Sequence, residues 1–418
     1  MTAPAAIELP RLEKRGMATQ LIVDGGPYLV LGGELHNSSS SSLAYVKPIL
    51  PRLKAMNLNT VLAVVSWDLV EPEEGRFDWT LVDGLIEEAR RNDLRLILLW
   101  FGSWKNGLSH YVPDWVKADD ERFPRAKVRT GTLEVLSPFA PANWEADAKA
   151  YTTFMRHLRE IDDDRHTVLM VQMQNEVGLH ADTRDRSGLA DAAFEAPVPK
   201  ALTDYLVAHK ETLLPELRAV WQRTGFRTSG TWTEVFGPGP QTDEIFMGWH
   251  YARYCDRLAA AGKAILPLPV FVNAWIVQPQ DELPGEYPSG GPQGHMLDIW
   301  RGGAPHIDLY APDIYLPNFA EVCAEFVRNG NPLFVPESRS GEQGVANAFV
   351  AIGTYNAIGY SPFGIDTRLQ DPETSPIARA YGLLETVAPL ILEHQSAGTI
   401  RAVSLTRENP NANVEMGA

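Results

Sequence analysis

Cysteine is nearly missing from this chain of 418 residues, in which Cys255 and Cys323 are the two that occur. Two cysteines cannot form a disulfide framework or a cysteine-based zinc site, so the fold must be held by a buried apolar core, which a chain of this length can build. Long apolar runs are missing too, since no stretch reaches the roughly 18 apolar residues that a membrane span needs. We therefore expect no disulfide scaffold and no membrane-spanning segment.

Basic residues are scarce relative to acidic ones, with 37 Lys and Arg against 53 Asp and Glu, a net charge of −16. Such a surface repels phosphate backbones and anionic lipid headgroups, so neither nucleic acid nor a membrane is expected as a partner. The chain as given starts without a basic segment followed by an apolar run, which predicts a cytoplasmic protein. A leader removed beforehand would instead make it periplasmic or secreted, and homo-oligomerisation stays open.

Several catalytic motifs are absent as well. No GxGxxG follows an apolar run, and the sequence contains no HExxH, GxSxG or GxxxxGK. These absences argue against the usual dinucleotide-binding fold, a zinc protease helix, a serine-hydrolase elbow and a phosphate-binding loop. We expect no cofactor and no metal.

Eight short apolar runs are present, and segments with helical periodicity, such as Leu81–Ala89 and Ala148–Leu158, lie between some of them. Runs that are apolar on both faces are typical of parallel strands covered by helices. The sequence predicts an α/β fold, an eight-stranded parallel β/α (TIM) barrel over residues 1–395, with an open doubly wound sheet as the alternative. The eight runs are Val30–Leu35, Thr60–Trp67, Arg95–Gly102, Val168–Glu176, Pro269–Ile276, Asp308–Tyr315, Pro332–Glu337 and Ala357–Asp366.

Long segments follow the third, fourth and fifth predicted strands, at Ser103–Asn143, Val177–Pro199 and Val277–His306. In a barrel all of these loops lie at the C-terminal face, where active sites of this fold are built. Beyond the barrel, Thr399–Leu405 has the pattern of a further strand. Residues 396–418 are therefore expected to be a C-terminal extension that could be the stub of an added β domain.

Two glutamates end predicted strands: Glu176 closes the fourth and Glu337 closes the seventh. Each alone could pair with an arginine, but together at one mouth they form the carboxyl pair that glycoside hydrolysis requires. One group must donate a proton while the other stays ionised, and burial together with mutual repulsion separates their pKa values.

Aromatic and polar side chains near the strand ends suggest a sugar ligand, because flat rings stack on pyranose faces while amides and carboxylates bind hydroxyls. Core packing is the alternative for any single tryptophan. His36 is expected to make an ordinary structural hydrogen bond, and Cys255 to be buried on a helix over 245–261. The candidate sugar contacts are Trp67, Trp104, Trp275 and Tyr315 among the aromatics, and Asp68, Asn106, Asn175 and Asn273 among the polar residues.

The run Trp67–Trp79 resembles the W-x-x-x-E-P-x-x-G-x-F-D-[WF] signature of the β-galactosidases of glycoside hydrolase families 35 and 42. Asn175-Glu176 is similar to the Asn-Glu pair of the wider clan of retaining barrel glycosidases, and Pro336-Glu337-Ser338 to its nucleophile strand. The resemblance spans about residues 25–395. It implies Glu176 as general acid/base, Glu337 as nucleophile, Asn175 as a partner of the sugar 2-hydroxyl and Tyr315 beside the nucleophile. We expect the Trp67–Trp79 run to be mainly architectural, with only Trp67 and Asp68 approaching the sugar.

The third strand departs from family 35, where a glutamate in the following loop helps to hold galactose. Lys105 and Asn106 stand in its place, so the chain resembles a divergent bacterial branch of that family. We predict a retaining, exo-acting β-glycosidase that hydrolyses terminal β-galactosides or related oligosaccharides by double displacement. The alternatives are another clan enzyme, an endo-acting glucanase or mannanase, and a carbohydrate-binding barrel without catalysis.

Overall fold

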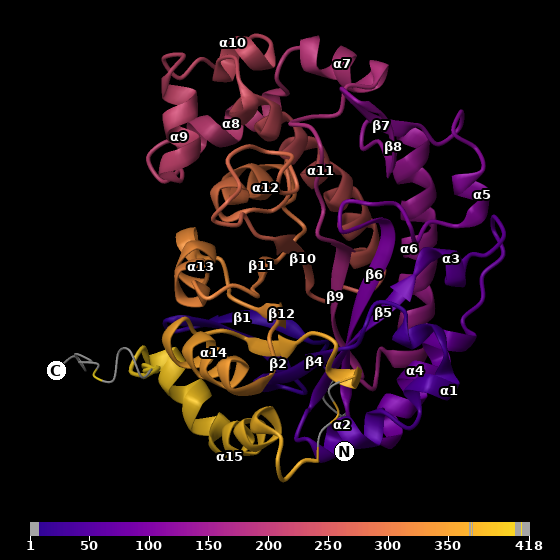
Figure 1. The fold of residues 1–418 in the computed structure, drawn as a ribbon, viewed down its shortest axis with the longest axis vertical. Coiled ribbons are helices and arrows are strands. Elements are labelled where there is room, and N and C mark those ends of the chain that lie inside the picture. The colour runs from indigo at the N-terminus through magenta and orange to yellow at the C-terminus, as the bar shows by residue number, and fades with distance from the viewer. Residues whose placement is uncertain (1–7, 368, 370, 406–410, 412–418) are drawn as a thin grey trace, which may run out of the picture.

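The computed structural model describes residues 8–367, 369, 371–405 and 411. Eight parallel strands follow one another around a barrel in chain order, and β13 pairs with β4 (Figure 1). The last gap, between β11 and β12, is closed by a hydrogen bond of 3.0 Å from the Ile314 amide to the Glu337 carbonyl. The barrel prediction is therefore confirmed. Its strands are β4 (Val30–Glu34), β5 (Thr60–Ser66), β6 (Arg95–Lys105), β9 (Val168–Asn175), β10 (Val270–Trp275), β11 (Leu309–Asp313), β12 (Val335–Ser338) and β13 (Gly359–Pro362).

Helices surround this barrel and bury their apolar sides against the outward faces of the strands. The two stretches with clear helical periodicity are the helices α4 and α6. None of the helices in the described part of the chain is both long enough and apolar enough to cross a bilayer. The outer helices are α1 (Leu43–Val46), α2 (Leu50–Ala55), α4 (Thr80–Arg91), α6 (Pro141–Asp162), α11 (Pro240–Lys263), α12 (Leu297–Gly303), α13 (Phe319–Phe326), α14 (Gly341–Thr354) and α15 (Pro376–Ala397).

A small antiparallel sheet, which the sequence analysis did not predict, precedes the barrel: β1 (Arg11–Arg15), β2 (Ala18–Val23) and β3 (Gly26–Tyr28). Leu21 of β2 joins the cluster of apolar side chains that fills the barrel interior. Asp24, after β2, pairs with Arg95 at the start of β6 at 2.7 Å. The sheet thus covers the end of the barrel at which the strands begin, and leaves the other end for the site.

The long strand-to-helix segments hold further elements at the C-terminal ends of the strands. The segment after β6 contains a short helix and a β-hairpin, and the segment after β9 contains four helices, so it is longer than predicted and continues to α11 (Figure 1). These elements are α5 (Asp114–Lys117), β7 (Arg125–Val128), β8 (Gly131–Leu136), α7 (Gly188–Glu195), α8 (Lys200–Ala208), α9 (Pro215–Gln222) and α10 (Trp232–Phe236). A further short helix, α3 (Trp67–Val70), follows β5.

The predicted strand Thr399–Leu405 is wrong. The segment carries no strand, because its backbone pairs with a side chain instead of a neighbouring strand: the Ala402 amide donates to Thr354 Oγ1 at 3.1 Å, and that hydroxyl donates to the Ala402 carbonyl at 3.1 Å. The helix before it, α15, runs past the predicted boundary at residue 395. Most of the remaining extension, 406–410 and 412–418, lies outside the described residues.

Candidate active site

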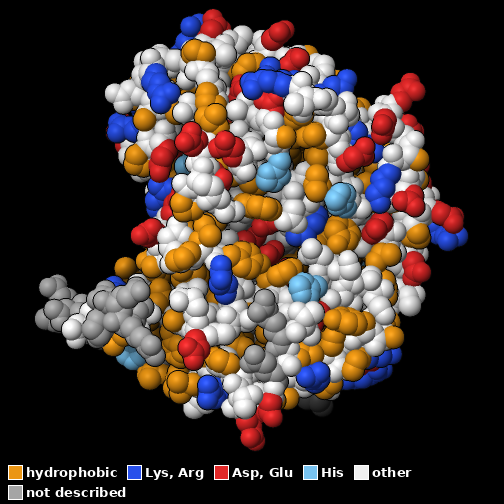
Figure 2. All heavy atoms as spheres, in the orientation of Figure 1, with side chains coloured by type: hydrophobic (Ala, Val, Ile, Leu, Met, Phe, Trp, Pro, Cys, Tyr) orange, Lys and Arg blue, Asp and Glu red, His pale blue; other side chains and the backbone are white. Residues whose placement is uncertain are grey.

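Glu176 and Glu337 meet at the C-terminal mouth of the barrel. Glu176 follows the last residue of β9, and Glu337 lies within β12. One carboxyl oxygen of each, together with one of Asp313, lies within 4.8 Å of the others. Both glutamates line a cavity of about 360 Å³. In Figure 2 the middle of the displayed face is hollowed, with acidic side chains visible inside. The two glutamates are 5% and 4% exposed, so their charges are poorly solvated.

The backbone that presents Glu176 is strained. Gln174 has φ of +60° and Glu176 has φ of +46°, a region that residues with a side chain rarely adopt. Polar contacts hold this conformation: the Glu176 amide donates to Asn273 Oδ1 at 2.9 Å, and Gln174 Nε2 donates to Asp147 Oδ2 at 2.7 Å. Asp147, fully buried on α6, also accepts from the Trp100 indole at 2.8 Å. The strand end is therefore fixed by the surrounding helix and strand.

Glu337 is held through both of its oxygens. The Tyr315 hydroxyl donates to Oε2 at 2.7 Å, and Asn175 Nδ2 donates to Oε1 at 3.3 Å. Lys105 Nζ donates to Asn175 Oδ1 at 3.0 Å, which fixes the orientation of that amide. Burial and the neighbouring Glu337 raise the pKa of Tyr315, so the phenol keeps its proton and remains a donor. These contacts hold both oxygens of Glu337 in place.

Glu176 has the opposite character. Burial, followed by the nearby charge of Glu337, raises the pKa of Glu176 to about 8, although Lys105 opposes the shift. Asn106 Nδ2 donates to Glu176 Oε2. At neutral pH this carboxyl therefore holds a proton that it can donate, while Asn106 and Lys105 can stabilise its ionised form.

Two further acids were missed by the sequence analysis. Asp313 ends β11 and lines the same cavity, and Glu34 ends β4 with no exposed surface. Neither oxygen of Glu34 has a hydrogen-bond partner among the described residues. Both acids end a strand in the structure, but the predicted apolar runs continued past them, to Leu35 and Tyr315, so the sequence analysis did not select them.

Six of the predicted sugar contacts, with Lys105 among them, gather around the two glutamates. Asn175 bridges Lys105 and Glu337, Asn106 contacts Glu176, and Tyr315 contacts Glu337. Trp275, the last residue of β10, is partly exposed and lines the cavity, so its ring is available to a ligand. Asn273 lies one layer deeper and binds the Glu176 backbone.

Trp67 and Trp104 do not belong to this group, and their prediction as sugar contacts needs correction. Both rings have no exposed surface, so neither can present a face to a sugar. The Trp67 indole donates to Glu71 Oε2 at 2.8 Å, and the Trp104 indole donates to the Leu136 carbonyl at 3.1 Å. Both indoles pack in the core, which the sequence analysis gave as the alternative for any single tryptophan.

The Trp67–Trp79 run is tied together around Glu71. Besides the Trp67 indole, Glu71 accepts the Gly75 amide at 2.7 Å, and Gly75 adopts φ of +79°, which favours glycine. Trp79 stacks on Phe77 with ring centroids 5.5 Å apart. None of these side chains lines the cavity between the glutamates as far as the structure describes it.

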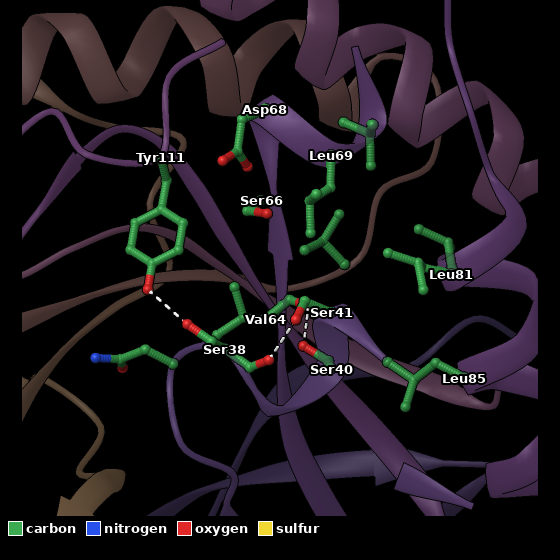
Figure 3. A pocket seen from close by; sticks show the side chains of 14 residues that line it. Ser38, Ser40, Ser41, Val64, Ser66, Asp68, Leu69, Leu81, Leu85 and Tyr111 are labelled. Carbon is green, nitrogen blue, oxygen red and sulfur yellow. Dashed lines mark hydrogen bonds between the residues drawn. The ribbon is translucent and has the colours of Figure 1, made fainter. Parts of the chain in front are cut away.

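Asp68 lines a second cavity of about 200 Å³, and Asn37 lines both cavities. Figure 3 shows Asp68 and Tyr111 on one side of this space and Leu81 and Leu85 on the other. Asp68 Oδ1 has no partner among the described residues, and burial raises the pKa of the Asp68 carboxyl. Asp68 therefore does not contact Glu176 or Glu337 directly.

His36 and Cys255 have the structural roles that the sequence analysis expected. His36 Nε2 lies 3.0 Å from Thr367 Oγ1, the ordinary hydrogen bond that was expected. Cys255 is buried on α11.

A β/α barrel with a buried glutamate pair at its fourth and seventh strands has the architecture of the barrel glycosidases. The chain belongs to glycoside hydrolase family 42, because the model of that family, described as beta-galactosidase, matches residues 43–254, just over half of the chain. The match includes the Trp67–Trp79 run and Glu176. Glu337 lies beyond the matched residues.

A beta-galactosidase of Xanthomonas manihotis is 30% identical over 181 residues, which are 41% of this chain and 27% of that protein. Among solved structures, the beta-galactosidase of Bacillus circulans sp. alkalophilus has a TM-score of 0.59 at 15% identity, covering 87% of this chain and 57% of that one. The beta-amylase catalytic domain of Paenibacillus polymyxa has a TM-score of 0.58 at 12% identity, covering 87% and 98%. At these identities the structures establish the fold alone. The chain matches only about a quarter of the length of the curated relative.

Proposed function

We propose that the protein is a retaining β-glycosidase that removes terminal β-galactosyl residues by double displacement. One observation carries this proposal: the buried carboxyls of Glu176 and Glu337, with oxygens no more than 4.8 Å apart, line one cavity. Retaining enzymes place their carboxyl groups about 5–5.5 Å apart, whereas inverting enzymes need roughly 6.5–9.5 Å to admit a water.

In the first step the Glu337 carboxylate attacks the anomeric carbon while Glu176 gives its proton to the departing glycosidic oxygen. The bond from the anomeric carbon to that oxygen breaks as the bond to Glu337 forms. Tyr315 and Asn175 orient the nucleophile, and the raised pKa of Glu176 keeps its proton available at neutral pH. The leaving group departs as an alcohol, and Glu176 becomes a carboxylate.

In the second step the Glu176 carboxylate takes a proton from a water molecule, and the water oxygen attacks the anomeric carbon. Glu337 leaves as a carboxylate, and Glu176 regains its proton. Lys105 and Asn106 stabilise the ionised Glu176 between the two steps.

The sugar assignment rests on the family and on the relatives described as beta-galactosidases. We propose that Trp275 stacks on the sugar and that Lys105 and Asn106, which line the same cavity, bind its hydroxyls. The contact of Asn175 with the 2-hydroxyl stays a prediction, because Asn175 is buried between Lys105 and Glu337. Asp68 would reach only a part of the substrate that enters the second cavity. The match to family 42 does not show the branch of family 35 that the sequence analysis expected. The exo action, the compartment and the oligomeric state stay predictions, as does the division into a barrel (1–395) and an extension (396–418).

A panel of 4-nitrophenyl β-glycosides tests the proposal, with proton NMR of the first-formed sugar to read its configuration. We expect the β-galactoside to react fastest and to release β-galactose first. Faster cleavage of a β-glucoside or β-mannoside would contradict the assignment of galactose as the sugar but would leave the proposed mechanism in place. Release of the α-anomer would contradict double displacement, and no cleavage of any glycoside would leave only a sugar-binding barrel.

A further inference from the structure

Asp313 is a carboxyl that the proposed reaction does not use, although it lies beside both groups that the reaction does use. Its oxygen lies within 4.8 Å of those of Glu176 and Glu337, and the side chain is 3% exposed. Oδ2 accepts from Asn273 Nδ2 at 2.7 Å, whereas Oδ1 has no partner among the described residues.

The hydrogen bonds of Asn273 decide which oxygen of Asp313 can carry a proton. The Glu176 amide can only donate, so the Asn273 atom that it contacts, at 2.9 Å, must be the carbonyl oxygen Oδ1. The other end of Asn273 is therefore the NH₂ group, and it donates to Asp313 Oδ2. Oδ2 is thus an acceptor, and Oδ1 remains as the oxygen that can carry hydrogen.

The surrounding charges favour the neutral acid. Glu176 from the end of β9, Glu337 from β12 and Glu34 from β4 all face Asp313, and Lys105 from β6 is the cation that acts on Glu34 and Glu176. Burial, followed by the charges of Glu337 and Glu176, raises the pKa of Asp313 well above its usual range. Like charges this close cannot all be ionised without water to screen them.

We propose that Asp313 is a neutral carboxylic acid that donates its Oδ1 hydrogen to Glu176 when Glu176 becomes ionised, and so acts as a positioning residue for the acid/base. This inference rests on the proposed function. A hydrogen bond to the charged form of an acid favours ionisation, so Asp313 makes Glu176 a stronger proton donor. Asp313 keeps its own proton throughout, and the proton given to the leaving group comes from Glu176.

An ionised Asp313 would have the opposite effect, since a neighbouring negative charge raises the pKa of Glu176. The pH dependence of kcat/KM therefore distinguishes the two states, because its basic limb reports the loss of the proton from Glu176 in the free enzyme. Removing a hydrogen-bond donor moves this limb to higher pH, and removing a negative charge moves it to lower pH.

The experiment compares wild type, Asp313→Ala and Asp313→Asn on 4-nitrophenyl β-galactoside and on an alkyl β-galactoside, whose leaving group needs protonation. We expect the basic limb of Asp313→Ala to move up by about one pH unit. Its kcat on the alkyl substrate should fall about tenfold more than on the aryl one. Asp313→Asn, whose amide can still donate, should keep the wild-type limb. A downward shift in both variants, or unchanged profiles in both, would overturn the proposal.

Two further measurements cover variants that fold poorly or do not react. Asp298→Asn, which changes a buried acid on α12 outside the cavity, should leave the pH profile unchanged, and melting curves identify any loss of folding. Infrared difference spectra of wild type and Asp313→Asn at pH 7 should show the loss of one protonated-carboxyl band. No loss of that band contradicts the neutral acid even if no glycoside is cleaved, whereas band loss without cleavage rejects the proposed function alone.

Discussion

The two ends of the barrel interior are built on opposite principles. Near the strand starts the inward side chains are apolar and tightly packed, as with Phe271 and Phe334, whose rings meet edge to face at 5.4 Å. Near the strand ends lie the acids Glu34, Glu176, Asp313 and Glu337. Glu34 and Asp313 each leave buried oxygens without partners among the described residues. Burial of apolar surface stabilises the first end, whereas buried, unpaired carboxyls cost stability at the second. Stability and chemistry are thus separated along the barrel axis.

Single strands show this change from one end to the other. In β11 the inward positions are Leu309, Ala311 and Asp313, because side chains alternate with a period of two. In β4 the corresponding residues are Val30, Gly32 and Glu34. Each strand supplies both the core and the site, and the polarity changes within two residues. Substitutions at the two ends should therefore have separable effects on folding and on turnover.

The largest effect is expected at the acidic end. Glu337→Ala removes the proposed nucleophile, so turnover of every glycoside should fall by at least about 10⁴-fold, even for good leaving groups. The melting temperature should stay at or above that of wild type, because one of several crowded acids is removed. Steady-state rates on 4-nitrophenyl β-galactoside, measured beside a melting curve, check both parts. Residual activity above a few per cent would show that another group is the nucleophile.

The apolar end should respond in the reverse way. Phe334→Ala leaves a cavity beside Phe271, and truncation of a buried phenylalanine typically lowers the free energy of unfolding by about 3–5 kcal/mol. Urea unfolding measures this loss, and kcat per folded molecule should stay within about twofold of wild type. The comparison is Tyr45→Ala, since Tyr45 is 42% exposed. A large fall in kcat at full folding would mean that the two ends are coupled.

The pH dependence of activity should follow Glu176. Its pKa is raised to about 8, and the first step requires the protonated form. The value of kcat/KM should therefore be sustained below pH 8 and fall about tenfold per unit above it. A value of kcat/KM that already decreases as the pH rises from 5 to 7 would contradict the raised pKa of Glu176.

The smallest effect concerns Glu34, whose burial lowers the stability of the folded protein. Burial, followed by the charge of Glu337, raises the pKa of Glu34 in the folded state well above its usual range. Stability from a group with a raised folded pKa is present at low pH and is lost as the pH rises above the unfolded value. Glu34→Gln should therefore raise the melting temperature more at pH 8 than at pH 4. An equal change in melting temperature at both pH values would show that the pKa of Glu34 is the same in the folded and the unfolded protein.

The barrel could be predicted from the sequence, because each of its eight strands lies in a short apolar run. The sequence also placed Glu176 and Glu337, since both end such runs. Asp313 and Glu34 also end strands in the structure, but the predicted apolar runs continued past them and no known motif marks them. The burial of Trp67 and Trp104 could not be read from position, because a tryptophan after a strand end can turn toward the mouth or outward. The missing strand at Thr399–Leu405 depended on Thr354, about 50 residues away, which takes the place of a neighbouring strand.

The roles of the two glutamates are tested most directly by azide rescue of alanine variants on 4-nitrophenyl β-galactoside. In Glu176→Ala the glycosyl intermediate on Glu337 should form and accumulate, and azide, which needs no general base, should accelerate turnover and give the β-galactosyl azide. In Glu337→Ala azide can attack only from the face opposite the leaving group and should give the α-galactosyl azide. The β-azide from Glu337→Ala with the α-azide from Glu176→Ala would reverse the roles, and full activity in both variants would contradict the catalytic pair.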